Sequence, residues 1–597
     1  MKDIGDKAGE AKSYGNSGLA YHSLRDFNKA IESHEKSLEI DKDIGDKAGE
    51  AKCYINLGIV YHSLGDFNKA IEYHEKSLKI FKDVGDKAGE SMICGNLGYI
   101  YYNTHDYIDY NKSWNYVERA IKFIELVRES DITEELGKSF FKTKFDVYDL
   151  GVDVALKLYE TTEKEEHLKN AFEIIEKTKS RELVKKLNLK ETIPEKPENI
   201  KFDAVERFRE VIKNKPKCTV IEMYQQSDRI IYLLLTENKI KLYEQKIDPD
   251  VLEELIGEYF TVSAYLFNKL DRESSEELNE IIENKSDPFL NKLIGKYGRG
   301  EVRSMMSKVG TFHAALNEVI SYIVPEKLRT GLDSIKTDYL IVLPHRWLHD
   351  ISWEAAVINE KPLGLRYNLI RNYNLDLVTS NLNYSHHPFK NALIAFNLYK
   401  KENGLKTYTG ILEDECNAVK NKLKDYEVKY FSKEQATWDN IKKDLHDASL
   451  VHFHCHGSFS PENPLESSGI ELYKDHFISA KDILSEKIEF KNHPIILLRG
   501  CKTGRIGTDN IGTMGDEQMG LVTSFFTAKA STLIVTGWST YTEYGKEFSN
   551  YFYDSLLEGK NVAESLKYAR EKIYEKFGNK SRDWAAYMLY GNPFKFI

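Results

Sequence analysis

Two short segments of the chain combine residue types that together can cleave a peptide bond. In the first, LVHFHCHG, an apolar run leads into His456 and Gly457. In the second, PIILLRGC, another apolar run leads into Gly500 and Cys501, which lies 45 residues after His456. A thiolate is a strong nucleophile, and a nearby imidazole can accept its proton and later protonate a leaving amine. The pattern therefore predicts a catalytic dyad of His456 and Cys501.

The glycines beside these two side chains fit the same chemistry. Gly500 allows the backbone to turn sharply just before Cys501. The backbone N–H groups of Gly457 and Cys501 are predicted to face the oxyanion that develops on the attacked carbonyl. For Cys501 the alternative is a buried structural thiol, which is the commonest environment of a free cysteine.

The histidine run also offers a metal-binding interpretation. His452, His454 and His456 share one face of the predicted strand, and imidazole and thiol groups are good zinc ligands. Binuclear metallohydrolases, however, place an aspartate in this run and the last histidine five residues after the first. Here the third histidine comes after four residues, with no acid beside it. We therefore predict no metal and no cofactor, and interpret His452 and His454 as packing or orienting residues. Cys455 points the opposite way and is predicted to be core.

Acidic side chains follow Cys501 in a glycine-rich stretch. Asp509, Asp516 and Glu517 would form a substrate pocket that favours a basic residue before the scissile bond. The alternative is a solvated acidic loop. No Gly-Lys-Ser/Thr follows the glycines, which argues against a phosphate-binding loop. We expect a loop that becomes ordered on activation.

The residues of the predicted dyad need strands to position them, and strand patterns recur from residue 218 onward. Short aliphatic runs bounded by turns and separated by helical patterns indicate a mostly parallel sheet flanked by helices, with functional groups at the carboxyl ends of its strands. A charged helical stretch separates the first three runs from the rest, from Pro249 to about Glu326. The predicted strands are Cys218–Met223, Ile230–Leu235, Lys239–Tyr243, Tyr339–Leu343, Ala392–Phe396, Val428–Phe431, Leu450–His454, Ile495–Leu498 and Thr532–Thr536.

The chain begins with an internal repeat. Residues 4–43 and 44–83 match at 31 of 40 positions, and a third copy starts at Val84. In the second copy Leu57 lies on a first helix, Gly58 leaves room for a partner helix, and a turn precedes the second helix. All 13 prolines lie at or after Pro194, so the first third is predicted to be uninterrupted helix. A stacked array of helical hairpins follows from this pattern.

Composition narrows the class of protein. The chain has 597 residues and a formal net charge of −10. This negative charge argues against nucleic-acid binding as the main function. Its six cysteines are scattered, which is typical of a reducing compartment, and we predict a cytoplasmic protein. The first residues lack the apolar segment of a secretory signal, and no run is long enough to span a membrane.

The repeat resembles the tetratricopeptide repeat (TPR), in which a Leu-Gly turn is soon followed by an aromatic residue and then a small one. Here these are Leu64-Gly65, Phe67 and Ala70. The 40-residue period is longer than the usual one of about 34. The alternative is a generic array of helical hairpins. The resemblance implies a surface that binds a protein or peptide.

The second region resembles the CHAT domain, a caspase-like cysteine peptidase domain related to separase that often follows such repeats. The resemblance rests on the His-Gly pair at 456–457 and on the Cys-x-Thr-Gly segment at 501–504, each after a strand. Residues 338–357, 515–538 and 171–183 resemble flanking segments of the family. The family usually has Ser-Ala before the cysteine, whereas Arg499-Gly500 stand here; it often has aspartates after the tryptophan, where residues 539–542 are Ser-Thr-Tyr-Thr.

Together these patterns predict three parts of the chain. Residues 1–189 form the TPR array, 190–217 a linker and connecting helix, and 218–597 a caspase-like CHAT peptidase domain. Within the last, 218–390 is the non-catalytic half and 391–597 the catalytic half.

The resemblance implies a cysteine endopeptidase that cleaves a partner protein, is regulated by a protein bound to its repeats, and takes part in antiviral defence. The competing hypothesis is a catalytically silent scaffold. We expect no membrane contact, and nucleic acid only through a partner complex.

Overall fold

The computed structural model describes most of the chain, with gaps that separate the described segments. The described residues are 6–129, 145–179, 203–269, 309–384, 389–396, 405–459, 463–473, 476–486, 488–500, 507–508, 518–538, 540, 542–578 and 582–597.

The chain divides into two compact units. The first comprises residues 1–175 and 191–203, and the second 176–190 and 204–597. The functional boundaries drawn from the sequence at residues 189 and 217 stay predictions.

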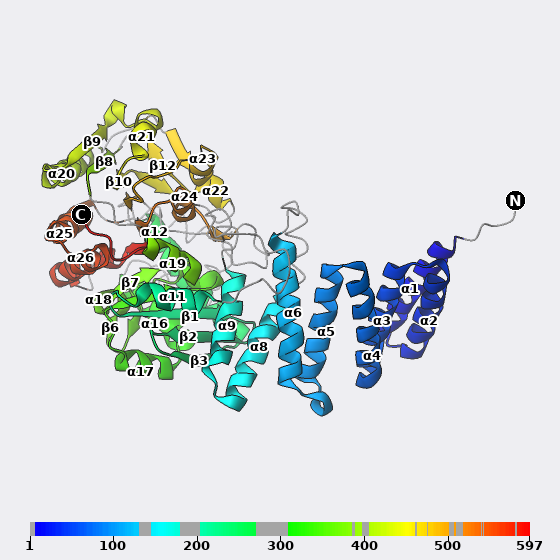
Figure 1. The fold of residues 1–597 in the computed structure, drawn as a ribbon. Coiled ribbons are helices and arrows are strands. Elements are labelled where there is room, and N and C mark those ends of the chain that lie inside the picture. The colour runs from blue at the N-terminus through cyan, green and yellow to red at the C-terminus, as the bar shows by residue number, and fades with distance from the viewer. Residues whose placement is uncertain are drawn as a thin grey trace, which may run out of the picture. The chain divides into compact units, whose positions relative to one another are not determined.

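The first unit is an array of paired helices, drawn from blue to cyan in Figure 1. Helices α1 and α2, α3 and α4, and α5 and α6 form successive hairpins, and each hairpin contacts the next. Among the described residues the helices of this unit are α1 (Lys7–Ser23), α2 (Phe27–Ile44), α3 (Lys47–Leu64), α4 (Phe67–Val84), α5 (Lys87–Asn103), η1 (His105–Tyr107), α6 (Tyr110–Glu129), α8 (Phe145–Thr162) and α9 (Glu165–Thr178), the last of which ends in the second unit.

Local sequence explains where these helices begin, end and meet. Asp46 caps α3 by accepting a hydrogen bond from the Gly49 N–H at 2.9 Å, and Gly65 ends the helix in the left-handed region at φ 81°. Gly58 lies against the ring of His74 on α4, where a Cβ would come within 2.6 Å of the ring. This close approach confirms that Gly58 leaves space for the partner helix.

The second unit is built on an 11-stranded sheet of order β3-β2-β1-β4-β7-β18-β17-β14-β10-β8-β9. Neighbouring strands are parallel except for the pairs β1–β2, β2–β3 and β17–β18. The strands are β1 (Cys218–Gln225), β2 (Arg229–Leu235), β3 (Ile240–Lys246), β4 (Tyr339–Leu343), β7 (Asn368–Arg371), β8 (Asn391–Phe396), β9 (Glu427–Ser432), β10 (Leu450–His454), β14 (Ile495–Arg499), β17 (Thr532–Thr536) and β18 (Tyr587–Gly591).

Small sheets and helices surround this sheet. The short strands are β5 (Val357–Ile358), β6 (Lys361–Pro362), β11 (His456–Ser458), β12 (Gly469–Leu472), β13 (His476–Ser479), β15 (Gly507–Thr508) and β16 (Gln518–Met519). The helices are α11 (Ala204–Ile212), α12 (Pro249–Lys269), α16 (Val309–Ile323), α17 (Glu326–Ser334), η3 (Arg346–Asp350), α18 (Leu363–Arg366), α19 (Leu375–Asn383), α20 (Leu405–Lys422), η4 (Lys433–Gln435), α21 (Trp438–Leu445), α22 (Pro464–Ser467), α23 (Ala480–Ser485), α24 (Leu521–Thr527), α25 (Thr542–Leu557), α26 (Val562–Phe577) and η7 (Asp583–Ala585).

Two sets of helices pack near strands β10 and β14. On one face, α21, α23 and α24 join a buried cluster that includes Phe453, Cys455, Leu498 and Phe525. This position confirms that Cys455 is a core residue. Helix α25 contacts both α20 and α26, as seen in red and yellow-green in Figure 1.

The structure confirms the predicted fold class, a helical repeat array followed by an α/β unit with a mostly parallel sheet. Each predicted strand is present within one or two residues at its start, and several extend one to three residues further. The patterns miss β7 and β18, whose runs NLIR and YMLYG are short and mixed in character. No helix in the described part of the chain combines the length and apolar character that a membrane span requires.

Candidate active site

The strands that lead to His456 and Cys501 are neighbours in the sheet. β10 and β14 pair in parallel with His454 opposite Arg499 at their last residues. The pairing continues one step further, because the Cys455 N–H donates to the Arg499 carbonyl at 3.2 Å. The backbone segments that follow β10 and β14 therefore leave the sheet at the same edge and at the same level.

His456 begins a different sheet. It opens β11, which pairs antiparallel with β12 so that His456 lies opposite Glu471 and Gly457 opposite Ile470. β12 in turn pairs with β13. His456 is half-buried, and the change of sheet at Cys455 carries it beyond the end of the parallel strands.

The remaining predicted site residues lie outside the described residues. These are the candidate nucleophile and the candidate pocket acids, namely Cys501, Asp509, Asp516 and Glu517. The structure describes the chain up to Gly500, whose carbonyl accepts a hydrogen bond from the Thr536 hydroxyl on β17. The dyad of His456 and Cys501 and the oxyanion role of Gly457 and Cys501 thus stay predictions.

His452 and His454 are buried on the face of β10 toward α20 and α25. His452 Nδ1 lies 2.9 Å from the Tyr553 hydroxyl, and the two rings stack with centroids 5.8 Å apart. Burial lowers the pKa of His452 to about 3. Burial also lowers the pKa of His454 well below its usual value, with further lowering from His452 and His456. Both rings are therefore neutral near pH 7, in keeping with packing or orienting roles.

A buried ion pair lies beside these histidines. Glu415 on α20 pairs with Arg499, the last residue of β14, and both side chains are almost fully buried. The Glu415 carboxylate also accepts a hydrogen bond from Ser549 of α25 at 2.6 Å. His454 Nδ1 lies 3.8 Å from Glu415 Oε2 and 3.7 Å from the Cys416 sulfur.

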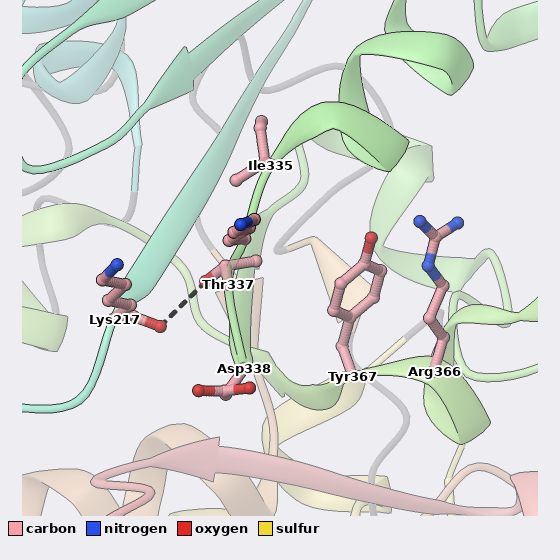
Figure 2. Close-up of a pocket in the computed structure, with 7 residues that line it drawn as sticks. Lys217, Ile335, Thr337, Asp338, Arg366 and Tyr367 are labelled. Atoms are coloured by element: carbon pink, nitrogen blue, oxygen red, sulfur yellow. Dashed lines mark hydrogen bonds between the residues drawn. The ribbon is translucent and has the colours of Figure 1, made fainter.

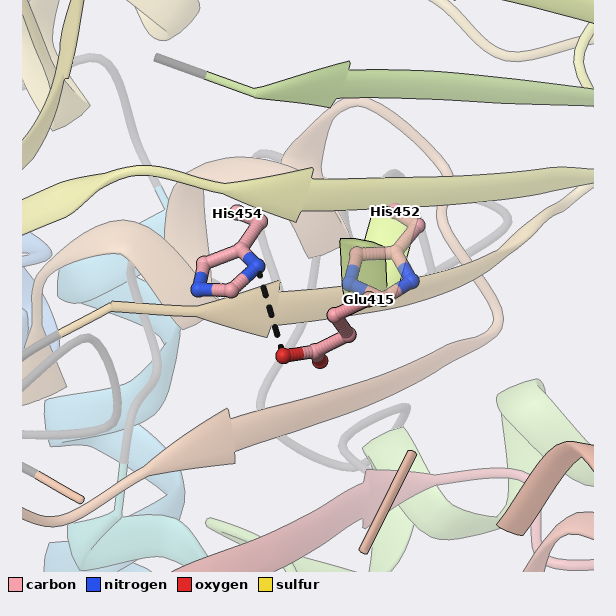
Figure 3. Close-up of side chains that lie close together, drawn as sticks. All are labelled: Glu415, His452 and His454. Carbon is pink, nitrogen blue, oxygen red and sulfur yellow. Dashed lines mark ion pairs between the residues drawn. The ribbon is translucent and has the colours of Figure 1, made fainter. Parts of the chain in front are cut away.

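Glu415, His452 and His454 have the donor chemistry of a divalent metal site (Figure 3). Their ligand atoms lie within 4.8 Å of one another, and all three residues are buried. Arg499 Nη1, however, pairs with Glu415 Oε2, the same oxygen that faces His454. A metal ion bound there would sit beside a buried guanidinium charge. The arrangement therefore favours the ion pair over a metal centre.

A surface pocket lies beside strands β1 and β4 of the sheet. Figure 2 shows its lining, which includes Lys217, Thr337, Asp338 and Arg366, around a cavity of about 550 Å³. The Thr337 hydroxyl donates to the Lys217 carbonyl at 2.8 Å. Lys217 and Asp338 immediately precede β1 and β4, and strands β7, β18 and β17 separate β4 from β14 in the sheet, so this pocket is distinct from the candidate dyad.

No sequence motif singles out Glu415, Ser549 or Gly545, although all three surround Arg499. One signal was available: an arginine that ends the apolar run IILLR must be paired if it is buried. The sequence does not indicate which of the many carboxylates pairs with it.

Residues 314–592 match the family model of the CHAT domain, and residues 9–83 match a model of the tetratricopeptide repeat. The chain has the TPR–CHAT architecture. The match confirms the resemblance drawn from the two motifs and supports a caspase-like peptidase fold for the second unit.

Two solved structures align with this TPR–CHAT chain. Separase of Saccharomyces cerevisiae, solved with securin, aligns at 12% identity and a TM-score of 0.48, covering 99% of this chain and 54% of that chain. The Arg-specific cysteine proteinase gingipain R aligns at 12% identity and a TM-score of 0.31, covering 48% of this chain and 68% of that one. The TPR–CHAT chain thus spans about half the length of the separase chain. No curated protein sequence matches it.

Proposed function

We propose that the TPR–CHAT chain is a cysteine endopeptidase that cleaves a partner protein. The observation that carries this proposal is the parallel pairing of β10 with β14, in register to their last residues. Adjacent parallel strands bring the segments that follow them to one edge of a sheet. His456 and Cys501 each stand two residues beyond a strand end, which supports their meeting there.

The proposed reaction has two steps. His456 takes the proton of the Cys501 thiol, and the sulfur attacks the peptide carbonyl while backbone N–H groups of Gly457 and Cys501 hold the oxyanion. The carbon–nitrogen bond breaks as His456 protonates the leaving amine. Water then gives a proton to His456 and its oxygen to the acyl carbon, which releases the carboxylic acid and restores the thiol. Asp509, Asp516 and Glu517 are proposed to favour a basic residue before the scissile bond.

Regulation through the repeats is part of the proposal. Leu19, Ile59 and Tyr99 occupy the same position in three successive first helices, and they are 48%, 38% and 45% exposed. An apolar row of this kind on stacked helices suits a protein or peptide partner. We propose that such a partner switches the second unit between inactive and active states.

The proposal is tested on the full chain in a cell lysate. Mass spectrometry of new protein N-termini should show cleavage products with the wild-type chain and none with Cys501→Ala or His456→Ala. Cys218→Ala is the matched control, because Cys218 is a buried thiol on β1, which four strands separate from β14, and should leave cleavage unchanged. Cleavage products that persist with Cys501→Ala would rule out catalysis by the dyad. Absence of any product with the wild type would favour the scaffold hypothesis.

A further inference from the structure

Arg499 is an unusual residue for the end of a buried strand. It closes the run IILLR of β14 and is only 4% exposed. Gly545 of α25 makes room for it, since a Cβ at that position would overlap the guanidinium group. A buried guanidinium needs both space and a counter-charge, and the surrounding helices supply both.

The counter-charge comes from Glu415, which touches four elements of the fold. Its own backbone is in α20, Ser549 of α25 donates to it at 2.6 Å, and it pairs with Arg499 of β14. The ring of His454 on β10 lies 3.8 Å away (Figure 3). Glu415 is 1% exposed, so these contacts form away from water, where charge interactions are strong.

The residues that Glu415 contacts stand close to the candidate dyad along the chain. His454 precedes His456 by two residues, and Arg499 precedes Cys501 by two residues. The backbone between these strands is joined by the hydrogen bond from the Cys455 N–H to the Arg499 carbonyl. One carboxylate therefore contacts the last residue of both strands that lead into the dyad.

We propose that Glu415 is a positioning residue for the dyad: its carboxylate, fixed by Ser549, holds the end of β14 through the ion pair with Arg499 and packs against the neutral His454 ring at the end of β10. The inference rests on the proposed function, and it adds a residue that neither sequence motif contains. Loss of the contact would let the strand ends shift, and a displacement of about 1 Å between reacting groups can cost roughly 100-fold in rate.

The test uses the full-length chain and needs no substrate. The rate of Cys501 alkylation by iodoacetamide is measured from pH 5 to 9, and Cys501→Ala serves as the blank. The other cysteines, Cys53, Cys94, Cys218, Cys416 and Cys455, are buried, so they should react slowly. His456→Ala gives the pH dependence of the alkylation rate when the histidine of the candidate dyad is absent.

Three variants separate positioning from stability. The double variant Glu415→Met/Arg499→Met removes both charges, and such replacements often preserve stability. We expect it to keep its melting temperature, while Cys501 alkylates about 10-fold more slowly at pH 7 with the pH profile of His456→Ala. The single variant Glu415→Gln should slow alkylation in the same way, and Arg499→Lys should retain part of the wild-type rate.

The matched control is another buried ion pair of the second unit. Arg371 pairs with Glu354, and both side chains are 3% exposed or less. Glu354→Met/Arg371→Met should leave the alkylation profile of Cys501 unchanged, whatever its effect on melting.

The outcomes distinguish the two proposals. A folded Glu415→Met/Arg499→Met chain with the wild-type profile would overturn the positioning role alone. If that double variant does not fold, a wild-type profile in Glu415→Gln would overturn it instead. If His456→Ala leaves the wild-type profile unchanged, the dyad itself is overturned.

Discussion

At the scale of single residues, the buried charge of Arg499 constrains the side chains around it. Its guanidinium occupies the space over Gly545, and Glu415 and Ser549 complete the polar contacts of the cluster. Gly545 and Ser549 are four residues apart and face the same side of α25. A change at Gly545 should therefore act on the ion pair without altering its charges.

We predict that Gly545→Ala lowers the stability of the second unit. The new methyl group would overlap the Arg499 guanidinium, and overpacking of this kind typically costs about 1–3 kcal/mol. Calorimetry of the full chain measures the shift in melting temperature. In an Arg499→Ala background the same substitution should cost much less, because the overlapping atoms are gone. An equal cost in both backgrounds would contradict a clash with Arg499.

Residue patterns reveal some of these roles and leave others hidden. His456 and Gly457 could be found because a motif marks them, and Cys455 because strand alternation assigns it to the core. Glu415 could not be found in this way, because it lies 84 residues before Arg499 in a helix with other acidic residues. Its importance comes from tertiary contact, which single-sequence patterns do not encode.

At the scale of elements, the repeat hairpins carry a buried histidine where their helices cross. His34 and His74 occupy the same position in α2 and α4, facing Gly18 and Gly58. Their Nδ1 atoms are buried and have no hydrogen-bond partner among the described residues. Burial lowers the pKa of both rings to about 4, with a smaller contribution from His22 or His62. The packed hairpins therefore require neutral imidazoles.

We predict that the first unit loses stability as the pH falls. In the unfolded chain His74 takes up a proton near pH 6.5, whereas the folded unit resists protonation until about pH 4. The folded pKa is depressed, so between pH 7 and 5 protonation favours the unfolded state by about 1–2 kcal/mol for this residue.

The measurement is calorimetry of the full chain at pH 7 and pH 5. The transition that His74→Leu shifts belongs to the first unit, and its fall in melting temperature on acidification should be smaller in that variant. His105→Asn is the control, because the His105 side chain is 99% exposed. An identical pH effect in wild type and His74→Leu would refute the role of His74.

The elements differ in how readily the sequence reveals them. The repeat helices were predictable because a 40-residue period repeats their caps, including Asp46 and Gly85. Strand β4 was predictable because the run YLIVL is apolar and lies between segments that interrupt the strand pattern. β18 was missed because its run of aromatic residues and methionine is short, and its place in the sheet depends on pairing with β17. Long-range pairing decides such strands.

At the scale of the whole molecule, α9 carries the chain from the first unit into the second. It begins at Glu165 in the first unit, and residues 176–190 belong to the second. Directly after it, the Lys179 ammonium is buried between the Glu222 carboxylate of β1 and the Leu343 carbonyl of β4, to which it donates at 2.8 Å. The end of α9 is thus fixed to the sheet by a buried charge.

A second carboxyl group lies in the same cluster. Glu176 accepts a hydrogen bond from the Leu375 N–H at 2.7 Å. Burial raises the pKa of Glu176 well above its usual value, and the neighbouring charge of Glu222 raises it further. Glu222 is the carboxylate that pairs with Lys179 in this cluster. A folded pKa raised in this way favours the fold at low pH and loses its contribution as the pH rises.

We predict that Lys179→Met destabilises the second unit by about 3–5 kcal/mol at pH 8, because it leaves a buried carboxylate without its cation. Lys179→Met/Glu222→Met should recover most of the wild-type melting temperature, because it removes both charges. Calorimetry of the full chain at pH 8 measures each effect.

The control for this prediction is an exposed ion pair of the same unit. Lys481 and Glu466 are paired at 2.7 Å, and both side chains are more than half exposed. Lys481→Met should therefore leave the melting temperature of the second unit unchanged. An unchanged melting temperature in Lys179→Met, or no recovery in the double variant, would contradict a charge-balanced anchor.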